Sequence, residues 1–306
     1  MIVLPLPVAV LICSIPLLFP PSRPQGIILP MRHLRLSRPF LLASCLLATA
    51  LSQAASLQAD LDPIFDSPRL NGVAVGVLVQ DLSGTVLYQR TPDRPFMPAS
   101  NMKLATGALA LRTWRDEHEF PPDAHAAWFG KHCAQPRPTC RLLSDMNKPS
   151  SNYLAEGFRQ ALLDAHAASD YQELMASAWR QVGLPVEGCV FVDGSGLSRQ
   201  NRLTPRFLVE LLRYMRTESD CAGPFVNSLP IAGVDGTLRT RMKDSCAAGC
   251  VRAKTGFLTG VSTLSGYVDR DGQVLCFSIM MNGFKGSADP MRELQNRACI
   301  AMAASM

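Results

Sequence analysis

The first 55 residues of the chain lack acidic side chains altogether, although they contain Arg23, Arg32, Arg35 and Arg38. These arginines account for most of the formal charge of +5, because the rest of the chain has 26 Lys and Arg against 25 Asp and Glu. A nearly neutral main part gives no indication of a nucleic-acid partner. The chain also lacks an internal repeat, and with 47% apolar residues it is too apolar to be wholly disordered. Its 306 residues suffice for one large domain or two small ones.

This leader also lacks an apolar run that would make a good membrane-spanning helix. Residues 1–20 are interrupted by four prolines, and the run at about 40–51 is too short to span a bilayer comfortably. Residues 31–55 instead have the three parts of a secretory signal: a basic stretch, the short apolar run, and the small residues Ser52-Gln53-Ala54. We therefore expect a signal peptide at 31–55. Residues 1–30 are then either upstream sequence translated by mistake or a disordered leader.

Export would permit disulfide bonds. Eight of the ten cysteines lie behind the leader, and they include two close pairs, Cys133/Cys140 and Cys246/Cys250. Either pair could close a small loop, but the sequence alone does not fix the connectivity. The alternative is free buried thiols, which the apolar strand pattern around Cys276 favours.

Strand patterns lie near both ends of the exported part, and helical patterns lie between them. This arrangement predicts an α+β fold, in which N- and C-terminal segments form a mostly antiparallel sheet. In chain order, we predict strands at 73–79 and 85–89, a helix at 100–112, an irregular segment at 113–148, helices at 151–164 and 168–182, a short strand at 189–193, a helix at 205–217, strands at 251–255, 262–269 and 274–282, and a closing helix at 290–302.

Ser100-Asn101-Met102-Lys103 places a hydroxyl and an amine three residues apart at the start of the first predicted helix. Positions i and i+3 share one face of a helix. A lysine whose pKa is lowered by burial or by nearby charge can act as the general base for such a serine. The helix N-terminus also favours a developing oxyanion. By itself the pattern also describes a capped surface helix.

Two further short patterns have comparable chemistry. Ser150 and Asn152 flank Ser151, and a second hydroxyl can relay a proton to a leaving group while an amide orients a lysine and a carbonyl. Lys254-Thr255-Gly256 lies in a predicted strand, where a cation and a hydroxyl can hold a carboxylate and glycine permits close backbone approach. Each pattern alone is weak evidence for catalysis. Ser150–Asn152, for example, is also typical of a helix cap. The three in this order form the known signature of serine acyl-transfer enzymes that react with penicillin.

The chain resembles the type-4 penicillin-binding proteins, the DacB-like D-alanyl-D-alanine carboxypeptidases and endopeptidases. The resemblance covers about residues 65–112 and 143–306. In the second motif, Ser151 stands where Asp is commoner. The similar segments are Pro98-Ala99-Ser100-Asn101-Met102-Lys103-Leu104, Asp145-Met146-Asn147-Lys148-Pro149-Ser150-Ser151-Asn152, Asp193-Gly194-Ser195-Gly196-Leu197-Ser198-Arg199-Gln200-Asn201-Arg202, Gly233-Val234-Asp235-Gly236-Thr237-Leu238, Leu264-Ser265-Gly266-Tyr267-Val268 and Asn282-Gly283-Phe284.

The resemblance implies a penicillin-binding protein/serine β-lactamase-like transpeptidase fold. Residues 56–306 would be the catalytic domain, including a short irregular or helical lobe at about 113–188. It implies a periplasmic enzyme that acts on peptidoglycan stem peptides and is inhibited by β-lactam antibiotics. No metal or organic cofactor is expected, nor nucleic acid, and membrane contact would be peripheral or absent.

The resemblance also implies a role for each site residue. Ser100 would be the nucleophile and Lys103 its general base. Ser150 would pass a proton to the leaving nitrogen, and Asn152 would position the substrate and Lys103. Substrate binding would fall to Lys254, Thr255, Gly256 and Phe257, with Lys254 and Thr255 on the terminal carboxylate and the N–H groups of Ser100 and Phe257 in the oxyanion hole.

The chain departs from that family between its first two motifs, where members usually carry a long insertion. Only residues 101–149 intervene here, and 113–142 resemble nothing in the family. The protein is therefore either a minimal enzyme or a remnant that has lost its insertion and its activity. A β-lactamase shares the three motifs, but the chain has no Glu-x-x-Leu-Asn to supply a deacylating base. His118, His125 and His132 match no common zinc-ligand spacing, so a solvated loop is the preferred interpretation there.

Overall fold

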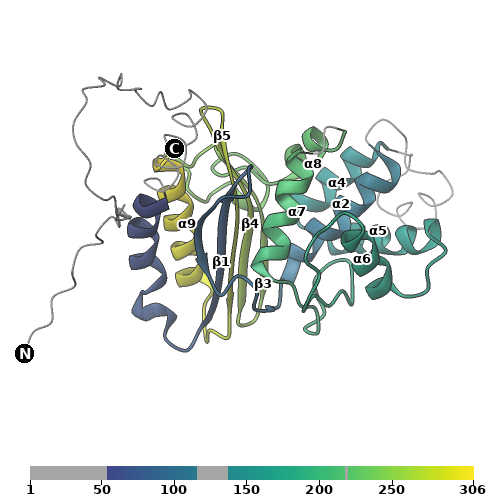
Figure 1. Cartoon of the computed structure of the whole chain (residues 1–306), viewed down its shortest axis with the longest axis horizontal. Helices are drawn as coiled ribbons and strands as arrows, with labels where there is room; N and C mark the ends of the chain where they lie inside the picture. Colours follow the sequence, from purple (N-terminus) through teal and green to yellow (C-terminus); the bar gives the residue numbers. More distant parts are fainter. Residues whose placement is uncertain (1–53, 116–136, 218–219) are drawn as a thin grey trace, which may run out of the picture. The chain divides into compact units, whose positions relative to one another are not determined.

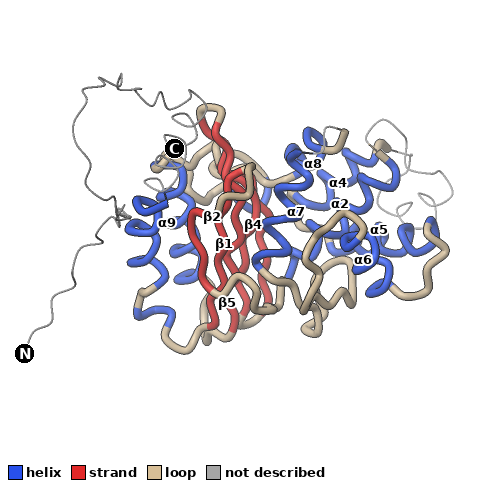
Figure 2. Tube along the Cα trace, in the orientation of Figure 1, coloured by secondary structure: helices blue, strands red, loops and turns tan. Residues whose placement is uncertain are grey.

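The computed structural model describes residues 54–115, 137–217 and 220–306. Its centre is a five-stranded antiparallel sheet in the order β2-β1-β5-β4-β3. Figure 1 and Figure 2 show helices on both sides of this sheet. The strands are β1 (Ala74–Asp81), β2 (Val86–Arg90), β3 (Val251–Leu258), β4 (Val261–Arg270) and β5 (Gln273–Asn282).

The sheet confirms the predicted α+β architecture. β1 and β5 lie about 200 residues apart in sequence, yet they pair directly, with Val77 opposite Ile279. All five main predicted strands form, and β3 runs three residues beyond its predicted end, to Leu258. That extension is possible because Gly260 (φ 76°) makes the tight turn into β4.

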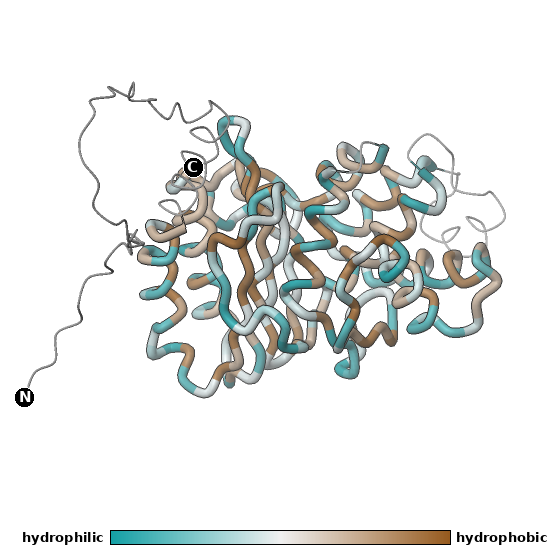
Figure 3. Tube along the Cα trace, in the orientation of Figure 1, coloured by the Kyte–Doolittle hydropathy of each residue, from teal (hydrophilic) through white to brown (hydrophobic). Residues whose placement is uncertain are grey.

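Alternating residues of each strand face two separate cores. Along β5, Leu275, Phe277 and Ile279 enter one core, while Cys276 and Met280 enter the other. This is the two-residue period that a sheet imposes when both faces are covered. Figure 3 accordingly shows strongly hydrophobic stretches within the strands and hydrophilic residues on the outer surfaces of the helices.

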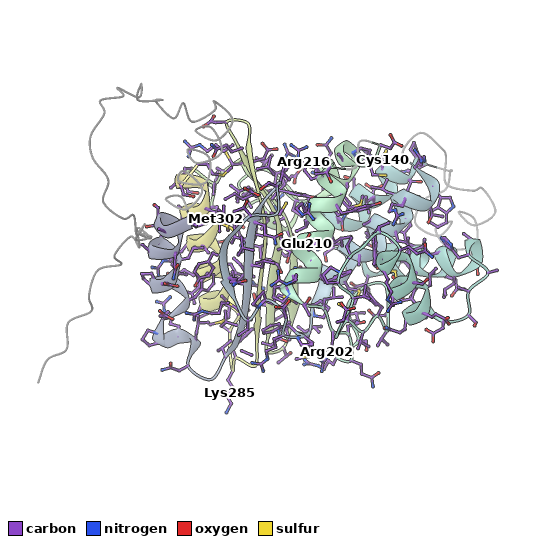
Figure 4. The ribbon with its side chains drawn as sticks, in the orientation of Figure 1. Cys140, Arg202, Glu210, Arg216, Lys285 and Met302 are labelled. Carbon is purple, nitrogen blue, oxygen red and sulfur yellow. The ribbon has the colours of Figure 1, made fainter. Side chains whose placement is uncertain are left out.

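One face of the sheet is covered by α9 and by a helix over residues 54–65. The other face is covered by α7, beyond which the remaining helices form a lobe that contains the second core. Figure 4 shows Met302 on the α9 side, and Glu210 and Arg216 on α7. The helices are α2 (Met102–Trp114), α4 (Thr139–Asn147), α5 (Asn152–Ala165), α6 (Tyr171–Arg180), α7 (Pro205–Thr217), α8 (Ala222–Ser228) and α9 (Asp289–Ala304), with short 3-10 turns η1 (Pro68–Leu70), η2 (Ala99–Asn101) and η3 (Gly236–Leu238).

Two sequence predictions about local structure are wrong. The segment expected to be irregular contains α4, whose start follows Pro138; proline is well tolerated at a helix start. The expected short strand at 189–193 is reduced to a single bridge between Val190 and Arg202. The side chain of Asn201 accepts the N–H of Val192 at 2.8 Å, and this side-chain bond replaces a strand ladder.

Several other expectations concern residues only partly described. Cys246 and Cys250 both carry free thiols, whereas Cys133 lies outside the described residues and leaves the other pair untested. The three histidines at 118, 125 and 132 also lie outside them, as does the proposed leader up to residue 53. Within the described ranges, no group of three or more His, Cys, Asp or Glu side chains is placed to hold a metal. None of the helices in those ranges has both the length and the apolar character needed to cross a bilayer.

Candidate active site

Ser100 lies in η2, the single turn that leads into α2. Ala99, just before it, has a left-handed backbone (φ 45°), a conformation that costs free energy for any residue other than glycine. Two glycines pack against this turn. A Cβ on Gly196 would come within 1.8 Å of the Ala99 carbonyl oxygen, and one on Gly256 within 2.8 Å of the Pro98 oxygen. The strained turn is therefore held between the 194–196 loop and β3.

Lys103 is wholly buried, and its amine reaches the Ser100 hydroxyl. Its Nζ lies 2.9 Å from Ser100 Oγ, and it donates to Asn152 Oδ1 at 2.7 Å and to the Ser195 carbonyl at 2.6 Å. These groups come from three segments: the start of α2, the start of α5 and the 194–196 loop. The structure thus brings together Ser100, Lys103 and Asn152, as the sequence motifs predict.

The surroundings of Lys103 favour its neutral form more than water does. Burial lowers the pKa of Lys103 to about 8, although the charges of Asp193 and Glu156 act in the opposite direction. A lysine with a pKa near 8 has roughly a tenth of its molecules in the basic form at neutral pH. The amine is therefore available to accept a proton from Ser100.

Ser150 and Lys254 form a second hydroxyl–amine pair. Lys254 Nζ donates to Ser150 Oγ at 2.9 Å and to the Thr255 carbonyl at 3.0 Å. Lys254 is also wholly buried, and burial followed by the positive charge of Lys103 holds its pKa well below the ordinary value. Ser150 has a left-handed backbone (φ 63°), which places it just ahead of α5 and its cap Ser151. Each lysine therefore serves one serine.

A buried polar network ties the two motifs on η2 and β3 together. The Asn101 amide is satisfied at both ends when its nitrogen donates to the Lys254 carbonyl at 2.9 Å and its oxygen accepts from Ser265 Oγ at 2.6 Å. Ser265 Oγ in turn bonds to Ser278 Oγ at 2.9 Å, and Thr263 Oγ1 donates to the Pro98 carbonyl at 2.8 Å. These side chains alternate with apolar residues along β4 and β5, so the lobe-facing side of the sheet carries the network.

Ser100 opens into a cleft of about 540 Å³, which is also lined by Ser150 and Asn152. Its remaining walls are Gly196, Leu197, Thr237, Thr240, Arg241, Thr255, Gly256, Phe257, Leu258, Ser262, Thr263, Asp289 and Arg292. All eight residues singled out in the sequence therefore line the cleft except Lys103 and Lys254, which lie buried behind it. A volume of this size suits a small-molecule or peptide ligand.

The wall beside β3 is polar at one point and aromatic at the next. Thr255 Oγ1 donates to Thr237 Oγ1 at 2.8 Å. Phe257 is 54% exposed, and the Arg292 guanidinium lies 5.2 Å from its ring centroid. Arg292 also pairs with Asp289 at 3.0 Å, and Asp289 is the one carboxylate among the described residues of the cleft.

Arg241 is a site residue that the sequence did not single out. Its Nε donates to Asn296 Oδ1 at 2.8 Å, and its Nη2 to Gln295 Oε1 at 3.2 Å, both on α9. No carboxylate pairs with Arg241 within the described residues, and burial lowers its pKa to about 10. A cation held by neutral groups at a cleft wall gives that wall a positive potential. The only sequence signal near Arg241 was the segment Gly233–Leu238, which resembles the family and ends three residues before it.

Ser195 was also missed as a site residue. It acts through its backbone carbonyl, which any residue could supply, so its identity carries little information. The surrounding Asp193-to-Arg202 segment was recognised only by resemblance. In the structure, Asp193 accepts the N–H groups of Gly196 at 2.7 Å and Ser198 at 2.6 Å, which fixes the loop against Lys103.

Comparison with known families places this geometry in context. A family model described as D-Ala-D-Ala carboxypeptidase 3 (S13) matches residues 57–127 and 132–304. The match extends through most of the segment 113–142, so the prediction that this segment resembles nothing in the family is wrong.

Among curated proteins, the chain is 39% identical over 158 residues to carboxypeptidase DacB of Mycolicibacterium smegmatis, covering 48% of this chain and 34% of the relative. It is 45% identical over 112 residues to a D-alanyl-D-alanine carboxypeptidase of Actinomadura sp. strain R39, covering 35% of this chain and 21% of the relative. In both cases, the chain matches about a third or less of the relative's length.

Among solved structures, the chain is similar to penicillin-binding protein 4 of Haemophilus influenzae in complex with a β-lactam. The TM-score is 0.63 at 16% identity, and the match covers 79% of this chain and 97% of the other. An ancestral class A β-lactamase has a TM-score of 0.59 at 16% identity, covering 82% and 100%. At these identities the likeness shows the transpeptidase-type fold predicted from the sequence, and it does not distinguish the two activities.

Proposed function

Because the chain belongs to the D-Ala-D-Ala carboxypeptidase 3 (S13) family, we propose that it is a serine-type D-Ala-D-Ala carboxypeptidase or endopeptidase acting on peptidoglycan stem peptides. The observation that carries the proposal is the buried Lys103 amine, 2.9 Å from the hydroxyl of Ser100 at the floor of an open cleft. A serine with an adjacent general base is the arrangement that acyl transfer requires.

In the proposed reaction, Ser100 Oγ attacks the peptide carbonyl carbon while its proton passes to the neutral Lys103 amine. The tetrahedral intermediate collapses with cleavage of the C–N bond, and the leaving nitrogen receives a proton through Ser150. Water then attacks the acyl ester on Ser100 and releases the shortened peptide. The backbone N–H groups of Ser100 and Phe257 are the proposed oxyanion donors.

The proposed role of Lys254 differs from the first expectation, whereas that of Thr255 is unchanged. Lys254 is wholly buried and donates to Ser150 and to a backbone carbonyl, which suits it to orient the proton relay rather than to touch a carboxylate. Thr255 and Thr237 line the cleft and can donate hydroxyl bonds to the terminal carboxylate of the substrate. Arg241 supplies positive charge on the same wall.

β-Lactamase activity is the second candidate, since class A β-lactamases share the fold. Rapid deacylation needs a base near the acyl ester. The one carboxylate among the described cleft residues, Asp289, is already paired with Arg292. This observation favours a long-lived acyl-enzyme, and with it the peptidase.

We further propose that the enzyme works outside the cytoplasm and is exported there through the signal peptide at 31–55. There it would meet peptidoglycan and be acylated by β-lactam antibiotics. No cofactor enters the proposed mechanism, because both proton transfers are assigned to side chains of this chain.

The test is covalent labelling of the full chain with a fluorescent penicillin, read by intact mass. The wild-type protein gains one penicillin mass, and Ser100→Ala gains none. Ser151→Ala is the matched control and retains labelling, because Ser151 caps α5 without touching Lys103. A cooperatively folded wild-type protein that forms no adduct would overturn the enzyme and leave a non-catalytic remnant. Adduct loss within seconds would indicate a β-lactamase.

A further inference from the structure

Behind the Lys103 amine lies a carboxylate that the proposed reaction does not use. Glu156 follows Asn152 by one turn of α5, and its Oε1 accepts the backbone N–H of Ser195 at 2.9 Å. The carbonyl of the same residue accepts from Lys103 Nζ at 2.6 Å. Glu156 and Lys103 thus hold the same residue, Ser195, by its two backbone groups.

Glu156 is the side chain that fixes the Ser195 N–H within its loop. Ser195 lies between Gly194, whose carbonyl accepts from Thr106 Oγ1 at 2.9 Å, and Gly196, which has a left-handed backbone. Two flanking glycines leave such a segment free to adopt other conformations unless hydrogen bonds fix it. Asp193 anchors the far side of the loop, and Glu156 anchors the residue that touches Lys103.

The charges around Lys103 also indicate that Glu156 acts on this amine. The carboxylates of Asp193 in the loop and Glu156 on α5 both act to raise the pKa of Lys103, and the charge of Lys103 in turn lowers the pKa of Lys254 on β3. Tyr171 on α6 and Arg159 on α5 lie in the same cluster, Arg159 being 5.3 Å from the Tyr171 ring centroid. Neither Glu156 nor Asp193 forms an ion pair among the described residues. Among the described residues, the two carboxylates that act on Lys103 therefore have no arginine or lysine salt-bridge partner.

We propose that Glu156 is a positioning residue for the general base. It holds the Ser195 peptide so that its carbonyl fixes the Lys103 amine beside Ser100, and its carboxylate offsets the buried positive charge. This inference rests on the proposed function only in assigning Lys103 as the base. Removing the negative charge of Glu156 lowers the pKa of Lys103, because that charge favours the protonated amine.

The decisive variant is Glu156→Gln, which keeps an oxygen acceptor for the Ser195 N–H and removes the charge. The rate of acylation by a fluorescent penicillin is measured against pH for the full chain. In the wild type this rate rises with pH and levels off above about 8. In Glu156→Gln the rise moves at least about 0.5 pH unit lower, while the limiting rate stays within about threefold.

Two further variants separate charge from position. Glu156→Ala removes both, so its limiting rate falls by about tenfold or more. Glu173→Gln removes an acid from the exposed side of α6 and leaves the profile unchanged. Thermal unfolding of each variant shows whether it folds. If Glu156→Ala does not fold, the near-isosteric Glu156→Gln decides the question. A wild-type profile in Glu156→Gln would overturn the inference.

A second measurement keeps the inference separate from the proposed function. The chain has six lysines, so carbon-13 labelling at lysine Cε gives a spectrum in which Lys103 is assigned through Lys103→Met. The midpoint of the Lys103 titration falls in Glu156→Gln relative to wild type, whether or not penicillin reacts. If the wild-type protein forms no penicillin adduct but the Lys103 titration shifts in Glu156→Gln, the enzyme proposal is refuted and the role of Glu156 is retained. If acylation is normal but the Lys103 titration does not shift in Glu156→Gln, the enzyme proposal is retained and the role of Glu156 is refuted.

Discussion

The two faces of the central sheet use the same five strands but bury different chemistry. The face under α9 is a continuous apolar core in which Ser262 and Gln295 bond to each other at 3.1 Å. The face toward the lobe buries Lys254, Ser265 and Ser278 in hydrogen bonds that lead to η2 and Ser100. The apolar face therefore stabilises the fold by burial alone. The polar face also fixes the position of η2 and Ser100, since a buried polar group is stable only with its partner in place.

The sharpest test of this contrast is Lys103→Met on the lobe side. Acylation by penicillin falls by about 1000-fold or more, because the general base is lost. The melting temperature also falls by several degrees, because methionine leaves the buried acceptors Asn152 Oδ1 and the Ser195 carbonyl without their donor, so the acylation rate is compared for the folded protein. Labelling kinetics and circular dichroism melts measure the two effects. Lys285→Met, at an exposed lysine that Figure 4 shows projecting from the protein, changes neither. Retention of a tenth of the rate would show that Lys103 is not the base.

The next largest effect comes from neighbouring residues on opposite faces of β5. Phe277→Ala lowers the free energy of unfolding by about 3–5 kcal/mol by opening a cavity in the apolar core. The acylation rate of the folded fraction stays within about threefold. Ser278→Ala has the inverse profile, with a stability loss of about 1 kcal/mol and acylation slowed several-fold through Ser265 and Asn101.

Urea unfolding and labelling on the same samples give both numbers for that pair. If Phe277→Ala slows acylation as much as Ser278→Ala does, the two faces are not separable and the contrast fails.

The smallest expected effect concerns Arg241, which lies between α9 and the cleft. Arg241 contacts α9 yet lines the cleft. Arg241→Gln weakens acylation by a penicillin with a free carboxylate by roughly tenfold and leaves the reaction with its methyl ester unchanged. The ratio of the two rate constants is the measurement. Arg69→Gln is the control, since Arg69 pairs with Glu293 at the surface, and it leaves the ratio at its wild-type value. Equal losses for acid and ester would show that Arg241 only supports the fold.

The strands and the closing helix were predictable because their signals are local. β1, β4 and β5 are runs of β-branched and apolar residues, and the turn at Asp271-Gly272 marks the last hairpin. α4 was missed because its nine residues follow a proline-rich stretch and are too few to establish a helical period. The expected strand at 189–193 failed because Asn201, eight or more residues later, takes up its backbone N–H groups.

The site divides in the same way between local and distant signals. Ser100–Lys103, Ser150–Asn152 and Lys254–Gly256 are short motifs, and the sequence order alone indicated that they act together. Glu156 and Ser195 lie 39 residues apart and meet through a backbone N–H, which leaves no side-chain pattern to detect. That Lys254 faces Ser150 instead of the open cleft is also a tertiary fact, set by the register of β3 against β4.

The pairing of β1 with β5 also fixes an order of events during synthesis. β1 is made early, but one of its two neighbours is residues 273–282, so its edge stays open while nearly 200 further residues are added. Such long-range closure delays folding. The unpaired edge of β1 can meanwhile pair with another chain, which makes the incomplete protein prone to aggregation until residue 282 has been made.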